Sequence, residues 1–324
     1  MKLLDIYARM KKEMAYVERE LEESIHTDHA LLNHSAVHLL KAGGKRIRPI
    51  FVLLSAQFGR YDLQRIKHIA VPLELIHMAS LVHDDVIDDA DMRRGQLTVR
   101  AKWDNRVAMY TGDYIFAQAL VVATELKNPR IHQILSSAIV ELSVGEIEQV
   151  RYFYRTDQTL RNYLLRIKRK TALLIAISCQ LGAVAADADD AYIRMLYEFG
   201  HNVGMAFQIR DDILDLTGTE KQLGKPPGSD IRQGNLTLPV LYALSDGRIR
   251  NELLAEIERI RLADGQTDVT PFLRLVREGP YLEEADKLSE RYIDRAIAAL
   301  SDLPNIRAKR DLIDIAYFIG DRSY

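Results

Sequence analysis

Apolar residues recur three or four positions apart along almost the whole chain. In the first segment the stripe consists of Leu3, Ile6, Met10, Met14, Val17, Leu21 and Ile25. Such spacing places side chains on one face of an amphipathic α-helix. The same period predicts further helices over Leu31–Ala42, Pro49–Phe58, Ile66–Asp88, Val107–Leu126, Ile131–Tyr152, Leu160–Ala186, Ala191–Leu216, Leu236–Leu244, Arg248–Leu262, Phe272–Arg277, Leu282–Leu300 and Ile306–Ile319. Clean alternating strands with hairpin turns are missing, so the sequence predicts an all-α protein of about a dozen helices.

Two of the predicted middle helices, Ile66–Asp88 and Leu160–Ala186, are apolar on nearly every side. A helix of this kind belongs in the centre of a bundle. No stretch rich in Pro, Gly and Ser divides the chain, and we expect a single domain over residues 1–324. The one long segment with glycine and proline, Thr217–Asn235, carries many charges. Loops of this length in compact domains tend to be functional.

Composition and charge narrow the class of protein. The chain has 324 residues, 48% of them hydrophobic, and a net charge of -2 from 44 basic and 46 acidic side chains. This balance argues against a protein that coats nucleic acid. Cys179 is the one cysteine, which excludes a disulfide framework and fits a small buried side chain in a reducing cytosol.

The chain shows neither a signal peptide at its N-terminus nor an apolar run long enough to span a bilayer. We therefore expect a soluble, cytoplasmic protein. Peripheral contact with a membrane surface remains an alternative if the substrate or product is hydrophobic.

A DDxxD pattern occurs twice, each time at the end of a long apolar segment. Its members are Asp84, Asp85 and Asp88 in the first copy, and Asp211, Asp212 and Asp215 in the second. Positions i and i+4 share a helix face, so each copy forms a clamp of two carboxylates. Carboxylates near a helix C-terminus oppose the helix dipole and need a compensating positive charge. A solvated helix end would explain one copy, but two matching copies without His or Cys ligands favour hard Mg²⁺.

Basic residues that could bind a phosphate group accompany the acidic motifs. They fall into three sets: Arg93 and Arg94; Lys45, Arg46 and Arg48 in AGGKRIRP; and Lys170, beside Thr171, with Lys225. Each set alone could be a solvated basic face. Arginine beside DDxxD nevertheless favours a diphosphate ligand, because guanidinium groups bind phosphate in a bidentate manner. The motifs GxxxxGK[ST], GxGxxG, GxSxG and HExxH are absent, which disfavours the common nucleotide-binding and hydrolase chemistries.

With these motifs in their order, the chain resembles the trans-isoprenyl diphosphate synthase family. The resemblance runs from Gly43 to the end through GGKRIRP, HMASLVHDDVIDDADMRRG, KT, FQIRDDILD and LGKPPGSD. It implies a large all-α helical bundle around a deep central cavity, commonly dimeric. It also implies condensation of isopentenyl diphosphate onto an allylic diphosphate by ionisation, condensation and elimination.

The resemblance implies a role for each matching residue. The six aspartates of the two motifs would bind Mg²⁺, two or three ions per site, together with the allylic diphosphate. Arg93, Lys170 and Lys225 would hold that diphosphate, while Lys45, Arg48, His77 and Arg94 would hold isopentenyl diphosphate. Thr171 and Gln208 would line the reacting region. From its position alone, His77 would be interpreted as a core histidine.

Product length is expected to depend on Ala79 and Ser80, one helical turn before Asp84. Short-chain members of the family carry a bulky aromatic residue there, so the small pair predicts a long-chain product. The match is strongest to the large catalytic subunit of two-component members. It implies extension of farnesyl diphosphate to heptaprenyl diphosphate, with its 35-carbon chain, for the side chain of menaquinone. It also implies a dissimilar small subunit and little activity without it, with a homodimer as the state of the chain alone.

Three alternatives remain at this stage. A homo-oligomeric octaprenyl or solanesyl synthase is the first, a class I terpene cyclase the second, and a non-catalytic subunit the third. The second DDxxD motif and the set Lys45, Arg48 and Arg94 argue against a cyclase.

One departure from the family pattern is Asn235 in QGNLTLP, where many members have lysine, so its role is left open. Asp89 and Asp91 also have no assigned role, and a solvated helix end is expected for both.

Overall fold

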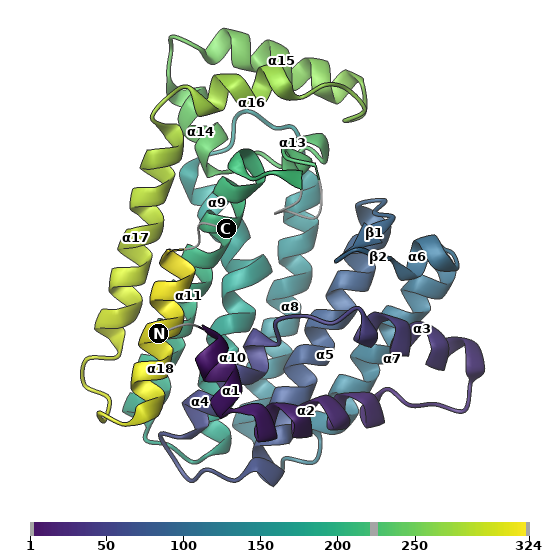
Figure 1. Ribbon diagram of the computed structural model, residues 1–324, viewed down its shortest axis with the longest axis vertical. Coiled ribbons are helices and arrows are strands. Elements are labelled where there is room, and N and C mark those ends of the chain that lie inside the picture. The colour runs from purple at the N-terminus through teal and green to yellow at the C-terminus, as the bar shows by residue number, and fades with distance from the viewer. Residues whose placement is uncertain (1–2, 221–225, 322–324) are drawn as a thin grey trace. The chain divides into compact units, whose positions relative to one another are not determined.

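The computed structural model describes residues 3–220 and 226–321, and most of them are helical (Figure 1). The predicted all-α fold class is confirmed. The described chain adds one small exception, an antiparallel pair of two-residue strands, β1 (Met92–Arg93) and β2 (Gln96–Leu97).

The chain divides into two compact units, each described here by itself. Unit 1 comprises Met1–Ser137, Leu174–Gly200 and Asp302–Ile315, and unit 2 comprises Ala138–Leu173, His201–Ser301 and Ala316–Tyr324. The helices α8 (Pro129–Arg151), α10 (Leu173–Ala185), α11 (Asp190–Thr217) and α18 (Arg307–Gly320) each contain one of the boundaries. No loop linker therefore separates the units at these four places, and the single domain over 1–324 stays a prediction.

Unit 1 is built around the long helix α5. Its complete helices are α1 (Leu3–Arg9), α2 (Lys11–Ser24), α3 (Ala30–Lys41), α4 (Ile47–Ala56), α5 (Leu63–Ile87), α6 (Val99–Lys102) and α7 (Asn105–Ala123). The unit also contains the first part of α8, most of α10 and the first turns of α11 and α18. Helix α5 packs against α7, α4 and α2. Because almost every residue of α5 from Ile66 to Ala79 is buried, its predicted place at the centre of a bundle is confirmed within this unit.

Local signals in the sequence explain where α5 begins and how closely its neighbours pack. The carboxylate of Asp62 accepts a hydrogen bond from the Gln64 N–H, which caps the helix. In the same unit Gly182 lets α10 touch α4, because a Cβ at this position would lie only 2.3 Å from the Val52 carbonyl oxygen. The stripe predicted at the N-terminus is also buried through Ile6, Met14, Val17 and Leu21, although the helix is interrupted at Met10.

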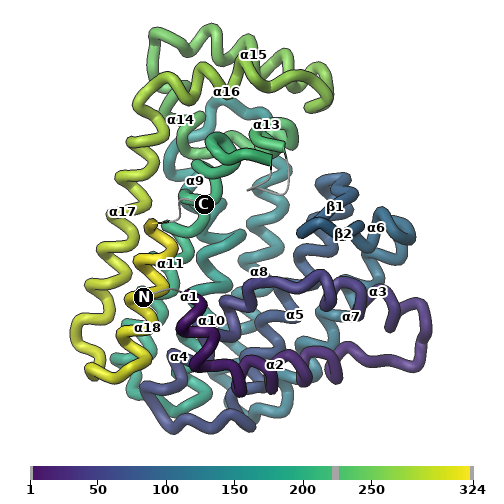
Figure 2. The backbone as a smooth tube through the Cα atoms, viewed as in Figure 1, coloured from purple at the N-terminus to yellow at the C-terminus, as the bar shows by residue number. Residues whose placement is uncertain are grey.

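Unit 2 contains the remaining helices and a second hydrophobic core. They are α9 (Leu160–Ile167), the π-helical segment η1 (Lys168–Ala172), α13 (Ser229–Arg232), α14 (Leu238–Ser245), α15 (Arg250–Leu262), α16 (Thr270–Arg277) and α17 (Tyr281–Ala299). Helix α14 packs against α17 and α15, and α15 lies beside α16 (Figure 2). The core of this unit includes Leu216, Ile231, Val240, Ile257 and Phe272. The end of α11 is anchored there by Leu216, directly after the second acidic motif.

Candidate active site

The first acidic motif lies at the C-terminal end of α5. Asp84 and Asp85 are in the last turn, and Asp88 is the C-cap, with its N–H donating to the Asp84 carbonyl. Asp85 is buried and accepts a hydrogen bond of 2.8 Å from Nε of Arg93. Burial raises the pKa of the Asp85 carboxyl, whereas the bond from Arg93 lowers it. The motif therefore concentrates negative charge where burial disfavours it, and further positive charge would stabilise it.

The hairpin after this motif directs its two arginines to different places. Arg93 ends β1 and turns back to Asp85, while Arg94 and Gly95 form a two-residue turn with φ of 52° and 75°. Positive φ at both positions is typical of a type I′ turn, which favours Asn or Gly over Arg. A Cβ on Gly44 would lie 2.5 Å from Nη1 of Arg94, so this guanidinium lies against the GGKRIRP loop.

Three residues of the predicted isopentenyl set, Arg48, His77 and Arg94, lie near one another in unit 1. Burial lowers the pKa of Arg48, and the charge of Arg94 lowers it further. The pKa of His77 is well below its ordinary value because of burial and of the charges on Arg48 and Arg94. Nε of Arg48 is buried without a hydrogen-bond partner among the described residues. Lys45 is the residue before Arg46, the N-cap of α4, whose first-turn N–H groups also favour an anion. The cluster fits a diphosphate.

The second acidic motif lies in the last turns of α11, within unit 2. Asp211 is exposed, whereas Asp212 and Asp215 are buried. Asp212 accepts hydrogen bonds of 2.7 Å from the Tyr163 hydroxyl and from Nε2 of Gln208. Burial and the charge of Asp230 raise the pKa of Asp212 to about 8. As in the first motif, this is a carboxylate whose ionised form would be stabilised by a cation.

Thr171 and Gln208 contact each other directly. The Thr171 hydroxyl donates to Oε1 of Gln208 over 2.6 Å, which continues the chain of hydrogen bonds to Asp212. Thr171 and Lys170 lie on η1, where the predicted helix Leu160–Ala186 is divided into α9, η1 and α10. Short π-helical segments inside α-helices occur frequently at functional sites. Lys170 is half-buried, with Nζ 3.5 Å from a carboxylate oxygen of Glu146.

Sequence reasoning missed two features of this site. Tyr163, on α9, is fully buried and bonds to Asp212, but no motif marks it. The hairpin of Met92–Leu97 was also missed, because Arg94–Gly95 is not one of the dipeptides that mark such a turn. Both features orient residues of the acidic motifs.

The remaining predicted residues have varied surroundings. Ala79 is buried, and the hydroxyl of half-buried Ser80 donates to the His77 carbonyl oxygen. Lys225 lies outside the described residues. The Asn235 N–H donates to the Asp230 carbonyl oxygen, and the structure assigns it no further role.

Two expectations made from single residues can be compared with the structure. Asp89 and Asp91 are exposed just beyond the end of α5, where both pair with Arg100. A solvated helix end describes them well. Cys179 is buried, and burial raises the pKa of its thiol to about 12, so the interpretation as a small buried side chain is confirmed.

The carboxylates suit a magnesium ion whose coordination is completed by a ligand. Within residues 3–220 and 226–321, no group of three or more His, Cys, Asp or Glu side chains is gathered closely enough to hold a metal ion. Mg²⁺ commonly binds through one or two carboxylates together with waters and substrate phosphates. The all-oxygen donor set of each motif is consistent with that mode.

In the same ranges, no helix is both long and apolar enough to cross a membrane.

Comparison with known proteins places the whole chain. A family model described as polyprenyl synthetase matches residues 29–271. Heptaprenyl diphosphate synthase component 2 of Geobacillus stearothermophilus is 56% identical, with 100% of both chains covered. The protein of the same name from Bacillus subtilis (strain 168) is 51% identical, with 100% of this chain and 92% of that protein covered.

Solved structures give the same picture. Heptaprenyl diphosphate synthase from Staphylococcus aureus is 41% identical with a TM-score of 0.90, over 97% of this chain and 99% of the other. A polyprenyl synthase from Caulobacter crescentus CB15, complexed with calcium and isoprenyl diphosphate, is 31% identical with a TM-score of 0.92, over 100% of this chain and 98% of the other.

The acidic motifs, the cationic cluster and the likeness along the full chain all indicate the same family. The family model alone covers well over half of the sequence. The chain therefore belongs to the polyprenyl synthetase family of prenyltransferases.

Proposed function

We propose that this chain is the catalytic component of a two-component heptaprenyl diphosphate synthase. It condenses isopentenyl diphosphate with farnesyl diphosphate and extends the product to heptaprenyl diphosphate, which provides the side chain of menaquinone. The observation that carries the proposal is identity of 56% and 51%, along the whole chain, with two proteins named heptaprenyl diphosphate synthase component 2.

In this proposal the acidic motifs bind the allylic diphosphate through magnesium. The ligands are Asp84, Asp85 and Asp88 in unit 1, and Asp211, Asp212 and Asp215 in unit 2. Bound Mg²⁺, two or three ions per site, supplies charge that stabilises the departing diphosphate. Arg93, Lys170 and Lys225 add positive charge to the same group. The bond from Arg93 to Asp85 supports this role, since it keeps the guanidinium beside the motif.

Isopentenyl diphosphate is held by the cationic cluster of Lys45, Arg48, His77 and Arg94. Once the allylic C–O bond has ionised, the double bond of isopentenyl diphosphate attacks the allylic cation. The proton is then lost to the released diphosphate. Thr171 and Gln208 line the region where the cation forms, and apolar walls exclude water from it.

A long product is supported by the small side chains of Ala79 and Ser80. Ala79 is buried within unit 1, one turn before the first motif on α5, where an aromatic ring would form a floor. With no bulky group at this point, the growing chain is free to extend past it.

A dissimilar second subunit is supported by the names of the two relatives and by one face of α8. The word component in those names implies an enzyme of two parts. In unit 2, Val140 and Ile147 have 60% and 72% of their surface exposed, and Val144 lies between them on the same face. Another face of α8 is occupied by Glu141 and Glu148, which pair with Arg169. An exposed aliphatic stripe suits a protein partner.

The proposed chemistry is tested by incubating the purified chain, with a candidate small subunit, Mg²⁺ and radiolabelled isopentenyl diphosphate. We expect label in longer prenyl diphosphates only when farnesyl diphosphate is also present. Release of cyclic hydrocarbons from farnesyl diphosphate alone would instead identify a terpene cyclase. Absence of any turnover in the two-subunit mixture would contradict the proposal.

A further inference from the structure

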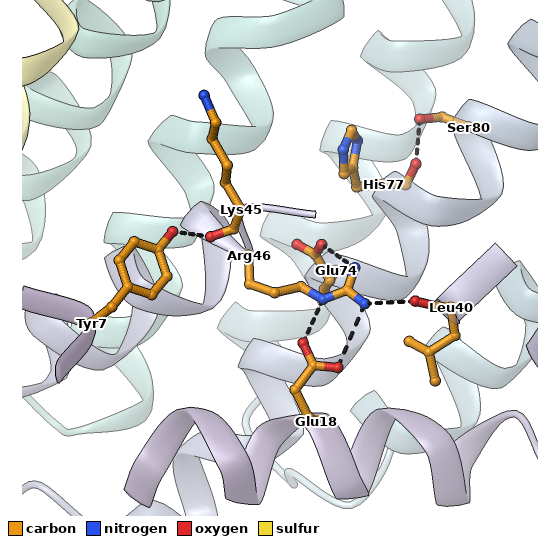
Figure 3. A network of polar contacts seen from close by, with 8 residues as sticks. All are labelled: Tyr7, Glu18, Leu40, Lys45, Arg46, Glu74, His77 and Ser80. Atoms are coloured by element: carbon orange, nitrogen blue, oxygen red, sulfur yellow. Dashed lines mark hydrogen bonds and ion pairs between the residues drawn. The ribbon is translucent and has the colours of Figure 1, made fainter. Parts of the chain in front are cut away.

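Arg46 lies inside the GGKRIRP motif, but its side chain pairs with the carboxylates of Glu18 and Glu74. It is 7% exposed, with φ of 44° in the left-handed region. Figure 3 shows the Lys45 and Arg46 side chains leaving the loop in opposite directions. For a residue with a Cβ, the left-handed conformation costs roughly 1–2 kcal/mol and persists where surrounding contacts enforce it.

Three neighbouring elements supply those contacts. Nε of Arg46 donates to Oε1 of Glu18 over 2.6 Å, from α2. Nη1 donates to Oε1 of Glu74 over 3.2 Å, from α5, and Nη2 donates to the Leu40 carbonyl oxygen over 3.2 Å, from α3 (Figure 3). Glu74 is buried one turn before His77. The guanidinium thus joins the loop to the helix that carries the histidine.

A second contact fixes the neighbouring residue. The hydroxyl of Tyr7, on α1, donates to the carbonyl oxygen of Lys45 (Figure 3). Burial and the nearby charge of Glu74 raise the pKa of Tyr7 to about 12, so the hydroxyl keeps its proton at neutral pH. The Lys45 main chain is therefore held from one side while the Arg46 side chain is held from the other.

We propose that Glu18, Glu74 and Tyr7 are positioning residues for isopentenyl diphosphate. They act through Arg46 and the Lys45 main chain to keep the loop in the conformation that presents Lys45 and Arg48 to the diphosphate. This inference rests on the proposed function of that cluster. Arg46 is the N-cap of α4, and Arg48 lies in the first turn, so the conformation of Arg46 sets the direction of the Arg48 side chain.

The sign of the effect of Glu18→Gln separates positioning from simple electrostatics. Removing the negative charge of Glu18 near the cationic cluster should strengthen the binding of an anion if Coulomb forces alone act. Weakening of the charge-assisted 2.6 Å bond to Arg46, for which the amide oxygen of glutamine is a poorer acceptor, should weaken anion binding if the loop must be held. Tyr7→Phe provides a second test in which no charge changes.

The experiment measures the dissociation constant of radiolabelled isopentenyl diphosphate by equilibrium dialysis against the full chain mixed with the candidate small subunit. We expect binding to weaken roughly three- to tenfold in Glu18→Gln, where the bond to Arg46 loses its charge, and in Tyr7→Phe, where one hydrogen bond is lost. Binding of farnesyl diphosphate should not change. The matched control is Glu20→Gln, which breaks the 3.0 Å pair with Lys67 between the same two helices, α2 and α5, and should leave both constants unchanged.

The outcomes are distinguishable. If the wild-type chain binds isopentenyl diphosphate, and Glu18→Gln and Tyr7→Phe bind it equally well or more tightly, the positioning role is overturned. The proposed function then still stands. An equal loss in Glu20→Gln also overturns it, since the effect would then belong to the packing of α2 on α5. A wild-type chain that does not bind isopentenyl diphosphate even with the small subunit present overturns both.

Discussion

At the scale of single residues, burial disfavours the charged form of candidate site residues of both signs. Asp85 and Asp212 both have a raised pKa, and burial is the main cause for each. Arg48 and His77 show the opposite, a lowered pKa, again with burial first. In the proposed function, magnesium would stabilise the ionised carboxylates and a diphosphate would stabilise the charged form of Arg48, so bound ligands would offset the cost of burying these charges.

Replacement of either clamp should abolish turnover. Asp84→Ala and Asp211→Ala each remove one carboxylate from the predicted magnesium ligands, and we expect the rate to fall by roughly a thousandfold. Asp91→Ala serves as the control, because this exposed aspartate from the same segment pairs only weakly, at 3.4 Å, with Arg100. Steady-state rates decide the matter, and a near-normal rate in either clamp variant would refute the metal assignment.

His77 should couple stability to pH. Its pKa is depressed in the folded protein, so the unfolded chain binds more protons as the pH falls through the ordinary histidine value of about 6.5. The free energy of unfolding should therefore decrease with acidification through that range. In His77→Gln this part of the decrease should disappear. Denaturant titrations of both proteins above and below this pH measure it, and identical pH dependence would show that His77 is not held neutral.

At the scale of elements, the periodic pattern predicted the helices well because each buries an apolar face. The ends of α5 and α11 fall at the two DDxxD motifs, as the sequence indicated. Features that depend on contacts distant in sequence were not predictable. Tyr163 finds Asp212 only after α9 and α11 have packed, and the π-helical segment η1 has the same local composition as an α-helix. The left-handed Arg46 likewise requires Glu18 and Glu74.

Helix α5 also carries the expected limit on product length. Ala79→Tyr would place a ring one turn before Asp84, and we expect a shorter product from a protein that still folds. Ala79→Ser controls for substitution without bulk. Reverse-phase sizing of the products, with thermal unfolding as a check on the fold, tests the idea. It would fail if the folded tyrosine variant made a product of unchanged length.

At the scale of the whole molecule, the chain is aligned from end to end with proteins named heptaprenyl diphosphate synthase component 2. This likeness could not have come from periodicity or composition, which predict only an all-α protein. We propose that the second component binds the exposed stripe on α8. The stripe of Val140, Val144 and Ile147 contains none of the predicted magnesium ligands, so it can be tested separately from the acidic motifs.

Ile147→Asp should impair association with the second subunit. The side chain is 72% exposed, so a charge there leaves the fold intact but introduces a desolvation cost at an apolar interface. We expect the dissociation constant of the complex to rise by at least about tenfold. Leu262→Asp is the matched control, because this residue is 76% exposed on α15, away from the stripe. Sedimentation velocity compares the variants, and equal association in both would contradict the assignment of α8.

The central claim is that this chain makes heptaprenyl diphosphate in partnership with a second subunit. The most direct measurement incubates the purified chain with farnesyl diphosphate, isopentenyl diphosphate and Mg²⁺, with and without the candidate small subunit, and determines the length of the product. We predict heptaprenyl diphosphate from the mixture and little or no product from the chain alone. Full activity of the chain alone, or a longer product such as octaprenyl or solanesyl diphosphate, would contradict the account.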